Sequence, residues 1–142
     1  MGFLTTQNEA GVRKAFDTLR DPVKLVVFSQ SLAAADLCLQ NEQLVREVAS
    51  LSEKITVEVL NLAIDRERAE GYGVDQVPAI VVEGARDYGL RFYGVPHGRE
   101  FQNFVEAIVL ASNGEPALTE ETRTALAGLG TDVEIKVFST PT

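Results

Sequence analysis

Phe28-Ser-Gln-Ser-Leu-Ala-Ala-Ala-Asp-Leu-Cys38 is the stretch that decides the fold of this chain. The β-branched run Lys24–Phe28 predicts a strand, and Ser29-Gln30-Ser31 predicts a turn with a candidate helix N-cap. Thiol enzymes place Cys-x-x-Cys at such a junction, because a helix N-terminus lowers the pKa of a thiol. Here the corresponding tetrad is Ala35-Asp36-Leu37-Cys38. The outer position, at the start of the expected helix, holds Ala35, and only the inner position, one turn into the helix, holds a thiol, Cys38.

Composition limits the partners that this chain can bind. The 142 residues are 45% hydrophobic, which suffices for one well-packed domain. The 21 acidic residues outnumber the 13 basic ones, the net charge is −8, and no run of Lys or Arg occurs. A phosphate backbone or an anionic membrane surface repels such a chain, so we expect neither nucleic acid nor membrane as a partner.

The sequence carries no targeting or metal-binding signal. Met1–Thr5 lacks the features of a signal peptide, and no apolar run approaches the roughly 20 residues that span a bilayer, so we expect a cytoplasmic protein. One cysteine permits no internal disulfide, and one histidine permits no Cys/His metal cluster, so neither metal nor cofactor is expected. That histidine, His97, lies in a loop between Pro and Gly and is expected to be solvent-exposed or capping.

The first half of the chain alternates helix and strand patterns. Asn8–Arg20 predicts a helix capped by Asn8, and Val23–Phe28 predicts the strand that follows. A long helix comes next, with an apolar stripe that we expect in the core: Leu37, Leu44, Val48 and Leu51. Lys54–Leu62 predicts a second strand that becomes more buried along its length, and Asp65–Tyr72 predicts a short polar helix.

A proline marks the entrance to the third strand. Pro78 precedes the apolar run Ala79–Val82, and proline suits a first strand position because it has no N–H to give to a ladder. The order of elements before it leads us to predict that the Val77-Pro78 bond is cis. A hairpin with a last strand at Leu90–Gly94 follows. The next helix has one apolar face, made of Phe101, Phe104, Val105, Ile108 and Val109.

This order of strands and helices is that of a thioredoxin-like fold, an α/β fold with a four-stranded mixed sheet flanked by helices. Four segments carry a closer resemblance: Pro22–Phe28, Leu51–Lys54, Val77–Ala79 and Leu90–Phe101. They resemble the N-terminal unit of two-unit, glutaredoxin-like protein disulfide oxidoreductases. They are also similar to the N-terminal domain of the flavin subunit of alkyl hydroperoxide reductase. The resemblance runs from about Ala10 to Thr142, and it matches Pro78 to the family's cis-proline.

The resemblance has implications for two sites. In the oxidoreductases the first unit carries its own Cys-x-x-Cys, whereas in the reductase domain that motif is lost from the first unit. Ala35 and Cys38 match the two motif positions, so this chain follows the second pattern and carries a vestigial motif. The resemblance also implies that the backbone of Val77, next to Pro78, binds an extended segment of a protein partner. The alternative is that this loop only caps the sheet.

The C-terminal part of the chain repeats its beginning. Shifted by 110 residues, Glu9–Ser29 aligns with Thr119–Ser139, and seven of twenty-one positions are identical. The identical pairs are Arg13/Arg123, Ala15/Ala125, Leu19/Leu129, Val23/Val133, Val27/Val137, Phe28/Phe138 and Ser29/Ser139. We interpret this as a duplication, although two amphipathic helices that each precede a β-branched strand could share letters by chance.

The duplication predicts how the chain is divided. Residues 1–114 would form a thioredoxin-like domain with an N-terminal helix. Residues 115–142 would form the helix and strand that begin a second, truncated unit, in a fragment of a longer protein or a natural short form. We expect the strand Asp132–Ser139 to pair with a sheet edge of its own chain or of a second copy in a homodimer.

Three functions are compatible with these residues. The first is the non-catalytic unit of a protein disulfide oxidoreductase or related thiol electron relay, serving cell redox homeostasis by docking a protein partner or a second thioredoxin-like unit. The second is a monothiol redox protein, which the expected burial of Cys38 disfavours. The third is a plain protein-interaction module. We expect the first, and hence no catalysis by this chain alone.

Overall fold

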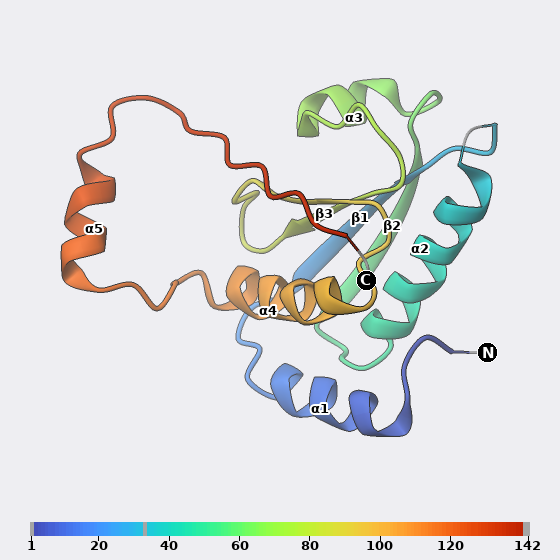
Figure 1. Ribbon diagram of the computed structural model, residues 1–142, viewed down its shortest axis with the longest axis horizontal. Coiled ribbons are helices and arrows are strands. Elements are labelled where there is room, and N and C mark those ends of the chain that lie inside the picture. Colours follow the sequence, from blue (N-terminus) through green and yellow to red (C-terminus); the bar gives the residue numbers. More distant parts are fainter. Residues whose placement is uncertain (1, 33, 141–142) are drawn as a thin grey trace.

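The computed structural model describes residues 2–32 and 34–140, and it places helices on both faces of one sheet (Figure 1). The elements in chain order are α1 (Thr6–Phe16), β1 (Val23–Ser29), α2 (Ala35–Ala49), β2 (Ile55–Asn61), α3 (Arg66–Tyr72), β3 (Ala79–Glu83), β4 (Leu90–Tyr93), α4 (Arg99–Asn113) and α5 (Glu120–Ala127). The strand order is β2-β1-β3-β4, with β1 parallel to β2 and β3 antiparallel to both of its neighbours. The four-stranded mixed sheet is therefore as predicted.

β1 is a continuous apolar run because it is buried on both faces. Leu25 and Val27 face a large core beneath α1, α2 and α4, whereas Val26 and Phe28 face a smaller cluster beneath α3. All four side chains have no exposed surface. The sheet thus has three helices on one face and the short α3 on the other (Figure 1).

The strand register brings three loops to one end of the sheet. Ser29 at the end of β1 lies beside Asn61 at the end of parallel β2. Phe28 lies beside Ala79 at the start of antiparallel β3. The loops that follow β1 and β2 and the loop that precedes β3 therefore lie together.

The entry into β1 is tied to α4 by one buried hydroxyl. Ser112 is 1% exposed, and its Oγ accepts hydrogen bonds from the N–H groups of Arg20 (2.9 Å) and Asp21 (3.1 Å). The same hydroxyl donates to the carbonyl of Asp21 at 2.7 Å. On the other side, Lys54 Nζ donates to the carbonyl of Leu19 at 2.8 Å. These bonds hold the α1–β1 connection in place.

The bounds of the predicted helices needed two corrections. α1 ends at Phe16 rather than Arg20, and its cap is Thr5 rather than Asn8, because Thr5 is extended and its Oγ1 accepts the N–H of Asn8 at 3.2 Å. α2 begins at Ala35, after Ala34 in a left-handed conformation (φ 53°) without a side-chain cap. The cap expected within residues 29–31 is therefore wrong.

Burial corrects two further expectations. In α2, Leu44 and Val48 are buried, but Leu37 is 48% exposed, so the core stripe is only partly as predicted. In β2, Ile55 is buried and the following residues are exposed or partly buried, so the expected rise of burial along the strand is wrong. The reason is that β2 lies at the edge of the sheet, with a neighbour on one side only.

The C-terminal segment, residues 115–140, lies outside the core. The predicted helix is present as α5, but every one of its residues is exposed. Within the described residues 131–140 no strand forms, so the strand expected at 132–139 is wrong for one copy of the chain. A strand needs a neighbour to accept its amides, and here the segment runs extended from α5 back toward the start of α4 (Figure 1), where Ser139 Oγ bonds Glu100 at 2.7 Å.

Candidate functional site

The candidate site lies where the loops after β1 and β2 meet the loop before β3. The N–H of Leu62 donates to the carbonyl of Ser29 at 2.9 Å and ties the first two loops together. The Val77-Pro78 bond is cis, as predicted, and the Pro78 carbonyl accepts the N–H of Gly94 at 2.9 Å. The expected proline loop therefore stands beside the end of β1, from which the chain leads to α2.

Ala35 and Cys38, which the resemblance matches to the motif positions, lie in the first turn of α2. Ala35 is the first residue of the helix and is exposed, whereas Cys38 is 4% exposed. The N–H of Cys38 already donates to the carbonyl of Ala34 at 2.9 Å, as part of the helix. With a methyl group at the outer position and a buried thiol at the inner one, the motif lacks an accessible nucleophile.

A buried amide lies one turn further along α2. Asn41 is fully buried, and neither polar atom of its side chain has a hydrogen-bond partner among the described residues. Cys38 and Asn41 are three residues apart, so their side chains lie on the same face of the helix. Sequence reasoning missed Asn41, because its position was only one polar residue among several in a helical pattern.

Val77 has a free backbone. Its side chain is partly buried against the cluster of Phe28 and Val81. Across residues 2–32 and 34–140, neither the N–H nor the C=O of Val77 has a hydrogen-bond partner in the protein. Both groups are therefore available to hydrogen-bond the backbone of an extended peptide segment.

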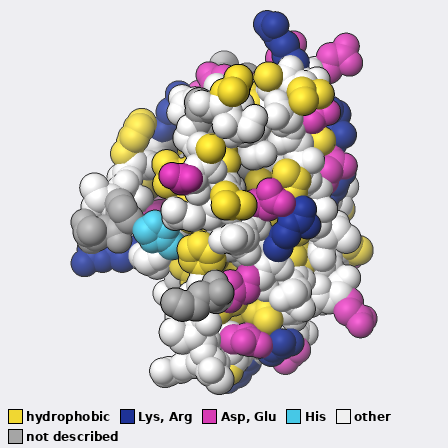
Figure 2. All heavy atoms as spheres, turned by 90° about the vertical axis from the view of Figure 1, so that its right-hand side faces the viewer, with side chains coloured by type: hydrophobic (Ala, Val, Ile, Leu, Met, Phe, Trp, Pro, Cys, Tyr) yellow, Lys and Arg dark blue, Asp and Glu magenta, His cyan; other side chains and the backbone are white. Residues whose placement is uncertain are grey.

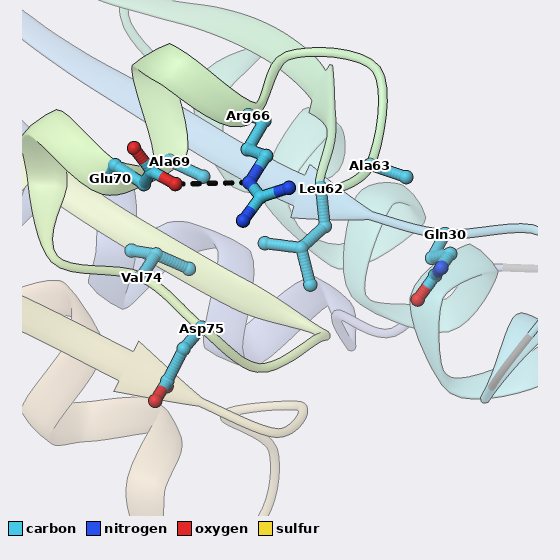
Figure 3. A pocket seen from close by; sticks show the side chains of 8 residues that line it. All are labelled: Gln30, Leu62, Ala63, Arg66, Ala69, Glu70, Val74 and Asp75. Atoms are coloured by element: carbon cyan, nitrogen blue, oxygen red, sulfur yellow. Dashed lines mark hydrogen bonds and ion pairs between the residues drawn. The ribbon is translucent and has the colours of Figure 1, made fainter.

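An open hollow of about 410 Å³ adjoins this loop. Its lining residues are Gln30, Leu62, Ala63, Arg66, Ala69, Glu70, Val74 and Asp75 (Figure 3). Figure 3 shows Leu62 and Val74 pointing into it, with the Arg66–Glu70 ion pair (3.0 Å) at its rim. The lining runs from Gln30, which follows β1, to Asp75, which lies two residues before Val77, so the hollow borders the same loops.

Tyr72 holds α3 on the sheet beside this surface. Its hydroxyl donates to Glu83 at 2.6 Å, and Arg91 Nε donates to its carbonyl at 3.0 Å. Burial and the bond to Glu83 raise the pKa of Tyr72 above its usual value. Arg91 also binds Asp87 through two bonds of 2.8 and 2.6 Å, and this pairing lowers the pKa of the Asp87 carboxyl. No sequence pattern indicated this network.

The rest of the described surface includes the single histidine and many acidic side chains. His97 is exposed, as expected. No group of three or more His, Cys, Asp or Glu side chains in the described part of the chain could hold a metal ion. On the face shown in Figure 2, hydrophobic side chains form small separate groups between acidic and basic ones. In the same part of the chain, no helix has the length and apolarity needed to cross a membrane.

Comparison with solved structures defines the class of fold. The chain superimposes on the N-terminal domain of the alkyl hydroperoxide reductase subunit AhpF from Enterococcus faecalis with a TM-score of 0.78 and 24% identity. It superimposes on a protein disulfide oxidoreductase from Aeropyrum pernix with a TM-score of 0.76 and 22% identity. The fold is therefore thioredoxin-like, and it is similar to both kinds of protein that the sequence segments had suggested.

Sequence comparison adds a shorter match. A probable thioredoxin from Methanothermobacter marburgensis is 46% identical over 48 residues, which is 34% of this chain and 51% of that protein. No protein-family model matches the chain. The structural match to the Enterococcus protein covers 85% of this chain and 58% of that protein's chain. The match to the Aeropyrum protein covers 91% of this chain and 56% of that protein's chain. The chain thus spans little more than half the length of these relatives.

Proposed function

We propose that this chain is a redox-degenerate thioredoxin-like unit that docks an extended segment of a protein partner and does not exchange disulfides by itself. It would act as the non-catalytic N-terminal unit of a protein disulfide oxidoreductase or a related thiol electron relay. The observation that carries the proposal is the pair of motif positions, where Ala35 is exposed and Cys38 is 4% exposed. Attack on a disulfide needs an accessible thiolate, and a second thiol must resolve the mixed disulfide.

The unused backbone at Val77 supports docking. Val77 keeps its N–H and C=O unpaired within the described chain. A partner strand would bond to this residue, while the adjoining hollow with Leu62 and Val74 would receive its side chains. Specificity would then come mainly from shape.

The direct test measures insulin reduction with dithiothreitol as donor. The wild-type chain should remain at the uncatalysed background, because neither Ala35 nor any other side chain can resolve a mixed disulfide. Turnover that exceeds the background and disappears in a Cys38→Ser variant would support the monothiol alternative instead. Slow labelling of Cys38 by a thiol reagent in the native protein is the expected accompanying result.

A gain-of-function variant tests the position of the motif. Ala35→Cys would place a second thiol on the same helix face as Cys38, because residues three apart are neighbours on an α-helix. We expect this variant to form an internal disulfide on oxidation and to reduce insulin above the background. The matched control is Asp36→Cys, which adds an exposed thiol two residues from Cys38, on a different face. Equal behaviour of both variants would show that Ala35 is not the outer motif position.

A further inference from the structure

The C-terminal segment exposes side chains whose counterparts in the first copy of the repeat are buried. Val137 and Phe138 are 84% and 90% exposed. The residues 110 positions earlier, Val27 and Phe28, have no exposed surface, because they lie in β1 at the centre of the sheet. Water-exposed apolar side chains on an extended segment are a typical signature of a strand that lacks its neighbour.

The composition of Val133–Phe138 differs from that of β1 in an informative way. β1 is apolar on both faces, as a central strand must be. In the repeat, Val26 is replaced by Lys136, so that apolar and charged residues alternate strictly from Val133 to Val137. Strict alternation is the pattern of a strand with one buried and one solvated face, and it suits the edge of a sheet rather than its centre.

The outer edge of β2 is a free site for such a strand. β2 ends the strand order, and within residues 2–32 and 34–140 no other strand pairs with its outer side. It is seven residues long, as long as the segment Val133–Ser139, whereas β4 at the other edge has four residues. Val57 and Val59 are only partly buried, so an added strand would cover apolar surface that is now open to water.

The pairing of β1 with β2 supplies the register. β1 lies parallel to β2, with Lys24 beside Thr56 and Val26 beside Glu58. The same register for the repeated segment would place Glu134 beside Thr56 and Lys136 beside Glu58. On one face of the sheet, three apolar pairs would then lie side by side: Val133 with Ile55, Ile135 with Val57, and Val137 with Val59. On the other face, Phe138 would lie beside Leu60.

Charge favours this register. Glu58 has a side chain that is 33% exposed and already binds Lys24 and Arg68. Lys136 would approach the same carboxylate from the open side, and Glu134 would balance the added positive charge. Opposite charges on neighbouring strands stabilise the pairing.

We propose that Val133–Ser139 of one copy adds to the outer edge of β2 of a second copy as a parallel fifth strand, and that reciprocal exchange forms a homodimer. A second copy supplies the strand because the segment of the same chain lies away from β2, with Ser139 Oγ donating to Glu100 in α4 at 2.7 Å. The two-fold exchange uses the same pair of surfaces in each copy, so the assembly closes at two chains.

The test is a cysteine cross-link in a Cys38→Ser background. Thr56→Cys combined with Glu134→Cys places thiols at residues that the register sets side by side, and both positions are exposed. The matched control combines Thr56→Cys with Val137→Cys, an equally exposed position that would lie on the opposite face of the added strand. Mild oxidation should double the 15.4 kDa mass of the first variant, with little dimer in the control. Thermal melting confirms that both variants fold.

Each other outcome overturns the proposal. A disulfide within one chain would mean that the segment pairs in cis, and an equal yield of dimer in the control would mean that the register is wrong. Light scattering on the unmodified chain provides an independent measurement. It should show a dimer that becomes a monomer when residues 130–142 are removed, and a wild-type chain that stays monomeric at all concentrations would refute the exchange. These results are independent of the insulin assay, because the β2 edge is distinct from the Val77 loop.

Discussion

Replacing Ser112 by alanine should destabilise the fold more than any other hydroxyl deletion in the chain. The Ser112 hydroxyl makes three hydrogen bonds to the backbone of Arg20 and Asp21, and it is 1% exposed. Its loss leaves two N–H groups and one C=O without their partner. An unsatisfied buried group costs about 1–3 kcal/mol, and water reaches the exposed side of this turn, so we expect a total loss of about 2 kcal/mol.

Urea unfolding followed by circular dichroism measures this loss. The midpoint should fall with an unchanged slope, and a loss of about 2 kcal/mol should lower Tm by roughly 4–10 °C in a chain of this size. The matched control is Ser50→Ala, because Ser50 is exposed and its hydroxyl makes one bond, to the carbonyl of Glu47. A difference of less than about 0.5 kcal/mol between the two variants would refute the reasoning.

Two further substitutions test other parts of the structure. Asp87→Asn should lower the stability at pH 7 by about 1 kcal/mol, because the bonds to Arg91 are weakened. The Asp87 pKa is depressed in the folded state, so its contribution is present above pH 4 and is lost as the pH falls. Urea midpoints of wild type and variant should therefore converge as the pH is lowered below 4, and a constant difference would contradict the assignment. Asn41→Leu should stabilise the chain by about 1 kcal/mol in the same assay, since it removes a buried amide without partners. A loss of stability would show that the amide is satisfied by an internal water.

Local patterns were enough to predict most of the fold. The apolar run of β1, the proline at the mouth of β3 and the apolar face of α4 each depend on a few neighbouring residues, and all three were found from the sequence. The start of α2 was not, because a left-handed Ala34 without a side-chain cap has no local signal. The fate of residues 132–139 could not be predicted either, since strand formation depends on a neighbour supplied by tertiary or quaternary structure.

In the candidate site, too, the features set by neighbouring residues were predicted and those that depend on tertiary packing were not. The burial of Cys38 and the cis bond before Pro78 were both expected from the sequence. The orphan amide of Asn41 and the bonds of Tyr72 were not, because they depend on which helix face meets the sheet. A polar residue in an amphipathic pattern does not reveal whether it will be enclosed.

The residues before α5 unfold together, whereas α5 and the residues after it unfold locally. α5 has eight residues, all exposed, and an isolated helix of fewer than about 12 residues is marginal in water. Within one copy of the chain, its amide protons will exchange through local fraying, while those of β1 exchange only when the whole sheet opens. For a single copy of the chain, a global unfolding transition therefore reports on residues up to the end of α4 and is blind to the C-terminal segment.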